Sequence, residues 1–181
     1  FVNGPLIKKI SQFDNFVFPI GTLTPVNTLG NNLKISSTQP GPLLWSAENK
    51  SPNSSYKRIT TPLLGASAQE YYEIKALNGS QAIVNINWTP NSDVTPLIAG
   101  GISNIRVASY NTTSHSWTEL ATSSVGNNSN GTATSLGLIS TTGIDSCSFT
   151  LGAITDLKPR AKMVPVGPVC GNAGIPIALQ R

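Results

Sequence analysis

Few side chains in this sequence have the types and the spacing that catalysis requires. The only histidine, His115, falls in the polar stretch NTTSHSW, which predicts the tip of a hairpin. A catalytic histidine needs a nucleophile and an orienting acid close to it. A histidine in a polar turn is more typical of a solvent-exposed surface residue, so we expect no catalytic role for His115.

The acidic residues do not predict a pair of cooperating carboxylates. There are eight of them, spread along the chain: Asp14, Glu48, Glu70, Glu73, Asp93, Glu119, Asp145 and Asp156. Glycoside hydrolysis needs two carboxylates that face each other across a cleft. Glu70 and Glu73 are three residues apart in a strand-like run, which places them on opposite faces. A glycosidase is therefore not supported.

Metal and cofactor sites are not predicted either. Zinc needs three or four ligands from His, Cys and carboxylates, calcium needs several carboxylates in one short loop, and neither spacing occurs. The glycine-rich stretches IAGGIS and VGNNSNGT lack the lysine and the strand-to-helix context of a phosphate-binding loop. We expect no catalytic residue, no metal ligand and no cofactor.

The tryptophans are the remaining candidates for ligand binding, because an exposed aromatic ring can form a platform for a sugar. Trp88 and Trp117 lie in alternating runs, which predicts that they pack in the core or against a sheet. Trp45, in the run LLWSAE, is less constrained. Trp45 is therefore the predicted ligand platform, provided that its ring is exposed.

The two cysteines, Cys147 and Cys170, allow one internal disulfide. Cys147 shares its parity with Phe149 and Leu151, which predicts that it points into the core as a small hydrophobic residue. Cys170 follows a proline-rich stretch, so its partner could equally lie further along a longer chain. Both alternatives stay open at this stage.

An all-β fold must position these candidates. The 181 residues include 16 glycines and 13 prolines, and no segment repeats apolar residues at a helical spacing. Short strand-like runs separated by turn residues predict an antiparallel β-sandwich, immunoglobulin-like or jelly-roll-like. In the run QAIVNINW, Ala82, Val84, Ile86 and Trp88 face one way, which predicts a central strand. Asn-Gly predicts a hairpin with the preceding run QEYYEIKAL, and NIRVASY and SWTELA form another.

Charge and hydropathy exclude two classes of partner. The net charge is +4, but the basic residues are scattered, with no basic face interleaved with aromatic residues as nucleic-acid binding requires. No apolar run approaches the roughly 20 residues that span a bilayer. We expect no nucleic-acid partner and no membrane insertion. A chain rich in Asn, Ser and Thr is typical of an extracellular protein.

Composition also suggests domain boundaries. The chain opens with strand-forming residues, FVNGPLIKKISQFDNFVFPIGT, as expected for a piece of a longer polypeptide. Four prolines follow in the stretch after Thr155, where a semi-rigid spacer is expected. We predict a sandwich over 1–155, a linker over 156–169, and over 170–181 the first strand of a following immunoglobulin-like domain or a strand that docks on a neighbour.

Several motifs resemble a known module when they are taken in order. FVNGPL, FVFPIGT, YYEI, VNINWTP, IRVASYNTTSHSWTEL, GNNSNGTATS and SFTLGAI are similar to a module of the large multidomain proteins that Bacteroidota export through type IX secretion. The resemblance covers about residues 1–154. The tail GPVCGNAGIPIAL is similar to the first strands of immunoglobulin-like or PKD-like repeats in such proteins. The middle loop, 49–68, and Cys147 depart from the commoner pattern.

The resemblance implies a role rather than a reaction. Proteins of this architecture include gliding-motility adhesins, surface filaments, and enzymes that carry such domains as spacers. The leading hypothesis is a non-enzymatic structural or adhesive module, whose partners are neighbouring domains or other surface proteins. The alternative is a carbohydrate-binding module of a secreted hydrolase, with a polysaccharide as partner. An enzyme in its own right is a third hypothesis.

Overall fold

The computed structural model describes residues 4–10, 15–20, 33–37, 43–50, 58–67, 69, 71–76, 81–92, 94–98, 100–140 and 147–154. The predicted linker, 156–169, and the predicted strand over 170–181 lie outside the described residues. These two domain assignments stay predictions.

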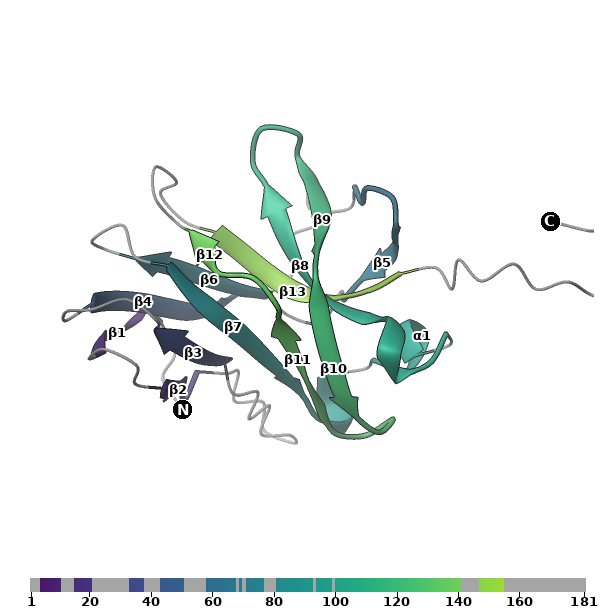
Figure 1. The fold of residues 1–181 in the computed structure, drawn as a ribbon, viewed down its shortest axis with the longest axis horizontal. Coiled ribbons are helices and arrows are strands. Elements are labelled where there is room, and N and C mark those ends of the chain that lie inside the picture. Colours follow the sequence, from purple (N-terminus) through teal and green to yellow (C-terminus); the bar gives the residue numbers. More distant parts are fainter. Residues whose placement is uncertain are drawn as a thin grey trace, which may run out of the picture.

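The described strands form two antiparallel sheets that pack as a sandwich (Figure 1). Sheet 1 has the order β1 (Leu6–Ile10), β4 (Leu43–Lys50), β6 (Tyr71–Ala76), β13 (Cys147–Ile154), β8 (Ile105–Asn111), β9 (Ser116–Leu120), and β5 (Leu63–Ala66) also pairs with β13. Sheet 2 has the order β10 (Thr122–Gly126), β11 (Gly131–Ser135), β7 (Gln81–Trp88), β3 (Leu33–Ser37), β2 (Asn15–Phe18), and β12 (Ile139–Ser140) pairs with β7. The short helical turns η1 (Pro90–Ser92), α1 (Thr95–Ile98) and η2 (Ile102–Asn104) lie between β7 and β8. The predicted antiparallel sandwich is confirmed.

Strand β7 has the central place that its alternating sequence predicts. It pairs with β11 and β12 on one side and with β3 on the other. Ala82, Val84, Ile86 and Trp88 are all buried in the core, whereas the residues between them are only half-buried. This is the period of two that a strand imposes when one of its faces is covered.

The predicted hairpin between β6 and β7 is wrong. β6 pairs with β4 and β13 in sheet 1, and β7 belongs to sheet 2. Both strands carry a buried alternating face, Tyr72, Ile74 and Ala76 in β6 and the row beginning at Ala82 in β7. Since two such faces bury each other best across a core, the chain crosses from one sheet to the other instead of turning within one sheet. The second predicted hairpin, β8 with β9, is confirmed.

A second hydrophobic cluster lies on the outer face of sheet 1. It consists of Leu63, Tyr71, Ala108, Tyr110 and Trp117, whose neighbours in β6 and β8 point into the main core. Part of the segment expected to be a polar loop, 49–68, contributes to this cluster: Leu63–Ala66 forms β5, which pairs with β13, and Leu63 is a buried member of the cluster. The expectation of a loop is wrong there: the run LLGA is too short to show a periodicity, but it is apolar enough to pack.

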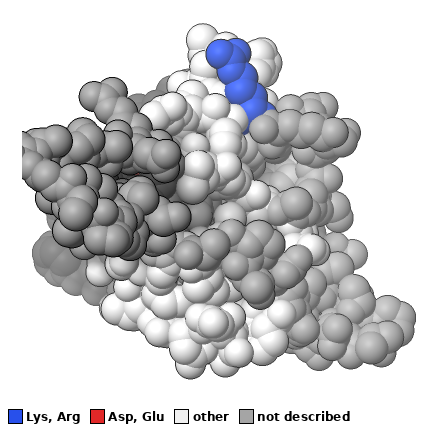
Figure 2. All heavy atoms as spheres, turned by 90° about the vertical axis from the view of Figure 1, so that its right-hand side faces the viewer, with Lys and Arg blue, Asp and Glu red and all other residues white. Residues whose placement is uncertain are grey.

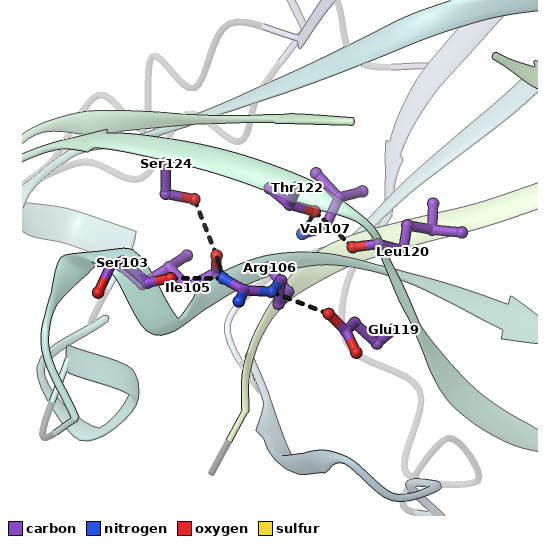
Figure 3. A network of polar contacts seen from close by, with 8 residues as sticks. All are labelled: Ser103, Ile105, Arg106, Val107, Glu119, Leu120, Thr122 and Ser124. Carbon is purple, nitrogen blue, oxygen red and sulfur yellow. Dashed lines mark hydrogen bonds and ion pairs between the residues drawn. The ribbon is translucent and has the colours of Figure 1, made fainter. Parts of the chain in front are cut away.

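Sheets 1 and 2 share a continuous edge where β9 leads into β10. Ala121 separates the two strands, and β10 no longer pairs with β8. Hydroxyl groups replace the lost ladder bonds (Figure 3): Val107 N–H donates to Thr122 Oγ1 at 3.0 Å, and Ser124 Oγ donates to Ile105 O at 2.8 Å. Thr122 Oγ1 also donates to Leu120 O at 2.6 Å. The crossing thus leaves these backbone groups of β8 and β9 with partners.

Replacing Thr122 with valine should lower the free energy of unfolding by about 1–3 kcal/mol, because the part-buried N–H of Val107 loses its acceptor while the side-chain volume is kept. Urea denaturation measures the change. Ser123→Ala is the control, since Ser123 is exposed on the same strand and should change stability by less than about 0.5 kcal/mol. Equal effects of the two substitutions would contradict the role of Thr122.

Candidate functional site

Trp45, the predicted ligand platform, is buried. Its side chain is 1% exposed and belongs to the main core, on the inner face of β4. Its register partner is Ala76, whose small side chain leaves room for the indole. A sugar platform needs an exposed ring face, so the expectation for Trp45 is corrected: β4 alternates, and Trp45 and Ala47 occupy its buried positions.

The other two tryptophans are also buried, as predicted. Trp88 is 1% exposed and Trp117 is 3% exposed. Trp117 lies in the second cluster, edge-to-face with Tyr110 at 5.3 Å and with Tyr71 at 6.4 Å between ring centroids. Residues 58–60 cover its strand, since Trp117 N–H donates to Arg58 O and Thr60 N–H donates to Trp117 O. The tryptophans therefore stabilise the fold and offer no ring to a ligand.

His115 lies at the exposed tip of the β8–β9 hairpin, as predicted. Asn111 Oδ1 accepts hydrogen bonds from the backbone N–H groups of Thr113 and Ser114, both at 2.9 Å, which closes the turn. His115 follows with a φ of 51°, in the left-handed region that favours glycine. His115 therefore has a place in the backbone geometry of the turn.

Replacing His115 with glycine should raise the free energy of unfolding by about 0.5–1 kcal/mol, because glycine adopts a positive φ without steric cost. The β-branched variant His115→Val should lower it by a similar amount or more. Thermal or urea denaturation of the two variants measures these opposite signs. A loss of stability in His115→Gly would show that the imidazole makes a favourable contact.

One small group of charges lies on the outer face of sheet 1. Glu48 of β4 is the register partner of Glu73 of β6, and Lys50 lies 2.8 Å from Glu48 and 3.8 Å from Glu73. The hydrogen bond to Glu48, and further the charge of Glu73, raise the pKa of Lys50. Lys50 is therefore charged at neutral pH and offsets the repulsion between the two carboxylates, and this stabilisation fades only above the ordinary lysine pKa.

The remaining described carboxylate, Glu119, is held by Arg106. Arg106 Nε donates to Glu119 Oε1 at 2.9 Å, and Arg106 Nη1 donates to the carbonyl oxygens of Ser103 and Ile105 (Figure 3). This ion pair ties η2 and β8 to β9 beside the crossing. Its donors are directed at groups of the protein itself, so the cluster is a structural clasp.

The structure describes little of the predicted disulfide. Cys147 begins β13 and its register partner is Ile74 of β6, and Phe149 and Leu151 of the same parity in β13 are buried in the core. Cys170 lies outside the described residues. The two alternatives for the cysteines therefore stay predictions.

Within the described residues, no three or more His, Cys, Asp or Glu side chains come together as a metal ion would require. None of the helices described here has the length and the apolar character to cross a bilayer.

A ladder of hydroxyl and amide groups covers the outer face of sheet 2, and the sequence reasoning missed it. Thr132 Oγ1 donates to Asn87 Oδ1 at 2.8 Å, and Thr134 Oγ1 donates to Asn85 Oδ1 at 2.7 Å, each across the β11–β7 pair. Lys34 of β3 continues the row of Asn85. The signal was present in the alternation of the two strands, with Asn85 and Asn87 at outward positions of β7 and Thr132 and Thr134 at outward positions of β11.

Charged side chains are sparse at one end of the sandwich. Figure 2 views the molecule from the side toward which β13 runs, and the described surface there is almost entirely uncharged, with no acidic side chain in view. The described cations that are not in ion pairs include Lys8, Lys9 and Lys34, in β1 and β3. No face of the described part gathers the charge and the aromatic rings of a nucleic-acid interface.

Comparisons of the chain with protein-family models, with curated proteins and with solved structures found no match.

Proposed function

We propose that this sandwich is a non-enzymatic structural module of a secreted or cell-surface bacterial protein, such as an adhesin or a surface filament, and that it holds neighbouring parts apart. The observation that carries the proposal is the separation of the two ends of the described fold. Leu6, Ala47, Ile74 and Cys147 are successive register partners across sheet 1, so they form one row.

Ile154, at the end of β13, lies far from that row. β13 has eight residues, so its end is about 23 Å beyond Cys147 along the strand. Three strand spacings add about 14 Å across the sheet. The ribbon agrees, since β1 lies at the left of the sandwich and the chain leaves β13 toward the right (Figure 1). A domain whose chain arrives and leaves at separate places adds reach to a longer protein.

Two further observations support the proposal. The aromatic rings of the three tryptophans are buried. The described charged groups form ion pairs with one another or lie isolated on the surface. The order of motifs that resembles modules of exported Bacteroidota proteins supports a place outside the cell. Neighbouring domains or other surface proteins are the partners that this role implies.

A second candidate function is carbohydrate binding, and the hydroxyl–amide ladder on sheet 2 is the observation that favours it. Asn87, Thr132 and Thr134 are half-buried on this outer face, at strand spacing, and keep part of their polar surface in contact with solvent. Sugar hydroxyls could exchange hydrogen bonds with such groups. Without a stacked ring, the affinity would rest on hydrogen bonds alone, which are individually worth little in water.

Titration of the 181-residue protein against a panel of soluble polysaccharides separates the two candidates. A structural module is expected to show no saturable binding by calorimetry or by NMR shift changes. Saturable binding that is lost in the double variant Asn87→Ala, Thr132→Ala would instead establish the ladder as a carbohydrate site. The matched control, Ser46→Ala on sheet 1, should leave any such binding unchanged. Surface proteolysis of intact cells then tests the location.

A further inference from the structure

The first two strands, β1 and β2, are edge strands that tension would load in opposite ways. β1 is antiparallel to β4, β4 to β6, and β6 to β13, so β1 and β13 run in opposite senses along sheet 1. Leu6 is the residue of β1 nearest to the end of β13. Ile10 pairs with Leu43, at the start of β4, and therefore lies farther from Ile154 than Leu6 does. β1 thus runs away from the place where the chain leaves.

Pulling the two ends of the fold apart draws Leu6 away from Ile154. That direction is the one in which β1 itself runs, from Leu6 toward Ile10, so the chain that precedes Leu6 has to double back there. The pairs between β1 and β4 are then loaded one after another, beginning with Leu6 and Ala47. A load that acts on one pair at a time separates a strand at a low force.

β2 is loaded in the other way. Four residues separate the end of β6 from the start of β7, and β7 returns in the sense of β13 (Figure 1). β3 is antiparallel to β7, and β2 is antiparallel to β3, so β2 also runs toward the end where the chain leaves. Tension on Asn15 pulls β2 along its own axis, away from the strand it begins. The four register pairs from Asn15–Ser36 to Phe18–Leu33 then carry the load together.

The side chains of β1 are also less buried than those of β2. In β1, Ile7, Lys8 and Lys9 are exposed, and Ile10 is the fully buried residue. In β2, Phe18 is buried in the core, as is the following Ile20, and the rings of Phe16 and Phe18 meet edge-to-face at 4.9 Å. Ile10, and Leu6 which packs against the core, return apolar surface to water when β1 leaves, and the two phenylalanines and Ile20 return more when β2 leaves.

We propose that β1 is a strap that tension releases first, and that β2 is the clamp that then holds the rest of the sandwich folded. The proposal rests on the proposed function, since it matters where the module bears tension. Release frees the nine residues from Leu6 to Asp14, about 30 Å of extended chain. A cation–π contact of Lys8 with Phe16, at 4.9 Å, joins strap to clamp. Each module then lengthens reversibly before it unfolds.

Single-molecule force spectroscopy on the full chain tests this, with handles attached at Asn3 and Asp156. The expected trace shows a low-force step with a contour-length gain of about 30 Å, followed by the main rupture at higher force. Moving the first handle to Ser11 bypasses β1, so the step should vanish while the force of the main rupture stays the same. A single rupture with the handle at Asn3 would overturn the proposal.

A disulfide lock provides the matched control. Ile7 and Ser46 are register partners on the outer face, and the Cα separation of antiparallel partners lies within the range that a disulfide accepts. In an Ile7→Cys, Ser46→Cys variant with both native cysteines changed to alanine, oxidation should abolish the early step and reduction should restore it. An early step that persists after oxidation would overturn the strap. Polysaccharide binding in the titration described above would contradict the spacer role but not the strap, because the low-force step is a property of the fold.

Discussion

Replacing Trp88 with alanine should lower the free energy of unfolding by about 3–5 kcal/mol, the usual cost of deleting a large aromatic side chain from a core. Trp88 ends the central strand of sheet 2, is 1% exposed, and packs beneath the β10–β11 hairpin. Its Nε1 donates to Asn127 O at 3.0 Å, which anchors the loop of that hairpin. The substitution therefore removes apolar contacts and a hydrogen bond together.

Urea denaturation, followed by far-UV circular dichroism, measures this loss. Val125→Ala is the matched control, because Val125 lies in the same hairpin with 66% of its surface exposed and should change stability by less than about 0.5 kcal/mol. Trp88→Phe should fall between the two, since it keeps most of the volume and loses the hydrogen bond. A cost below about 1 kcal/mol for Trp88→Ala would show that the hairpin collapses onto the vacancy.

Strands with a strict alternation could be predicted from the sequence, because each alternation has a single physical cause. In β7 the residues from Ala82 to Trp88 alternate between buried and half-buried, and in β8 Ile105 and Val107 point into the main core. An apolar residue at every second position indicates a strand with one buried face. The alternation does not determine which strands pair with each other, and the Asn-Gly signal between β6 and β7 predicted the wrong partner.

Trp45 shows that residue type alone can predict the wrong exposure for a side chain. Polar residues such as Ser46 and Glu48 follow it, so the indole looked unconstrained, yet Trp45 and Ala47 fill the inward positions of β4. The burial of Trp45 depends on β1 and β6, which lie far from it in the chain. Long-range pairing of this kind leaves no local signal.

The crossing at Ala121 was equally hidden from the sequence. Thr122 and Ser124 are common strand residues, and their roles as partners of β8 arise only because the chain changes sheets between them and Leu120. The hydroxyl–amide ladder had a local signal, since Asn85 and Asn87 share one parity, but its partners on β11 follow from the tertiary pairing. Sites made by two strands need the register as well as the pattern.

The second large effect should come from adding one methyl group between the indole of Trp88 and the hairpin that covers it. A Cβ on Gly131 would lie 1.9 Å from Trp88 Cζ2, so Gly131→Ala forces the ring or the hairpin to move. Its register partner Gly126 is also tight, with a φ of 144° and a Cβ position 2.4 Å from Asn130 O, so the backbone there has little freedom to yield. Overpacking of this kind costs about 1–3 kcal/mol, and we expect the upper end.

A double-mutant cycle shows whether the cost of Gly131→Ala belongs to its contact with Trp88. In a Trp88→Leu background the indole is gone, and the added methyl group should cost less than about 1 kcal/mol, which leaves a coupling energy of about 2 kcal/mol. Gly137→Ala is the control, because no atom lies within 4 Å of the Cβ position there. If Gly131→Ala costs as much without the indole as with it, the strain lies in the backbone of the hairpin. Trp88 would then be a core residue that merely rests beneath two glycines, and the close packing of ring on backbone would not be what fixes β10 and β11 on sheet 2.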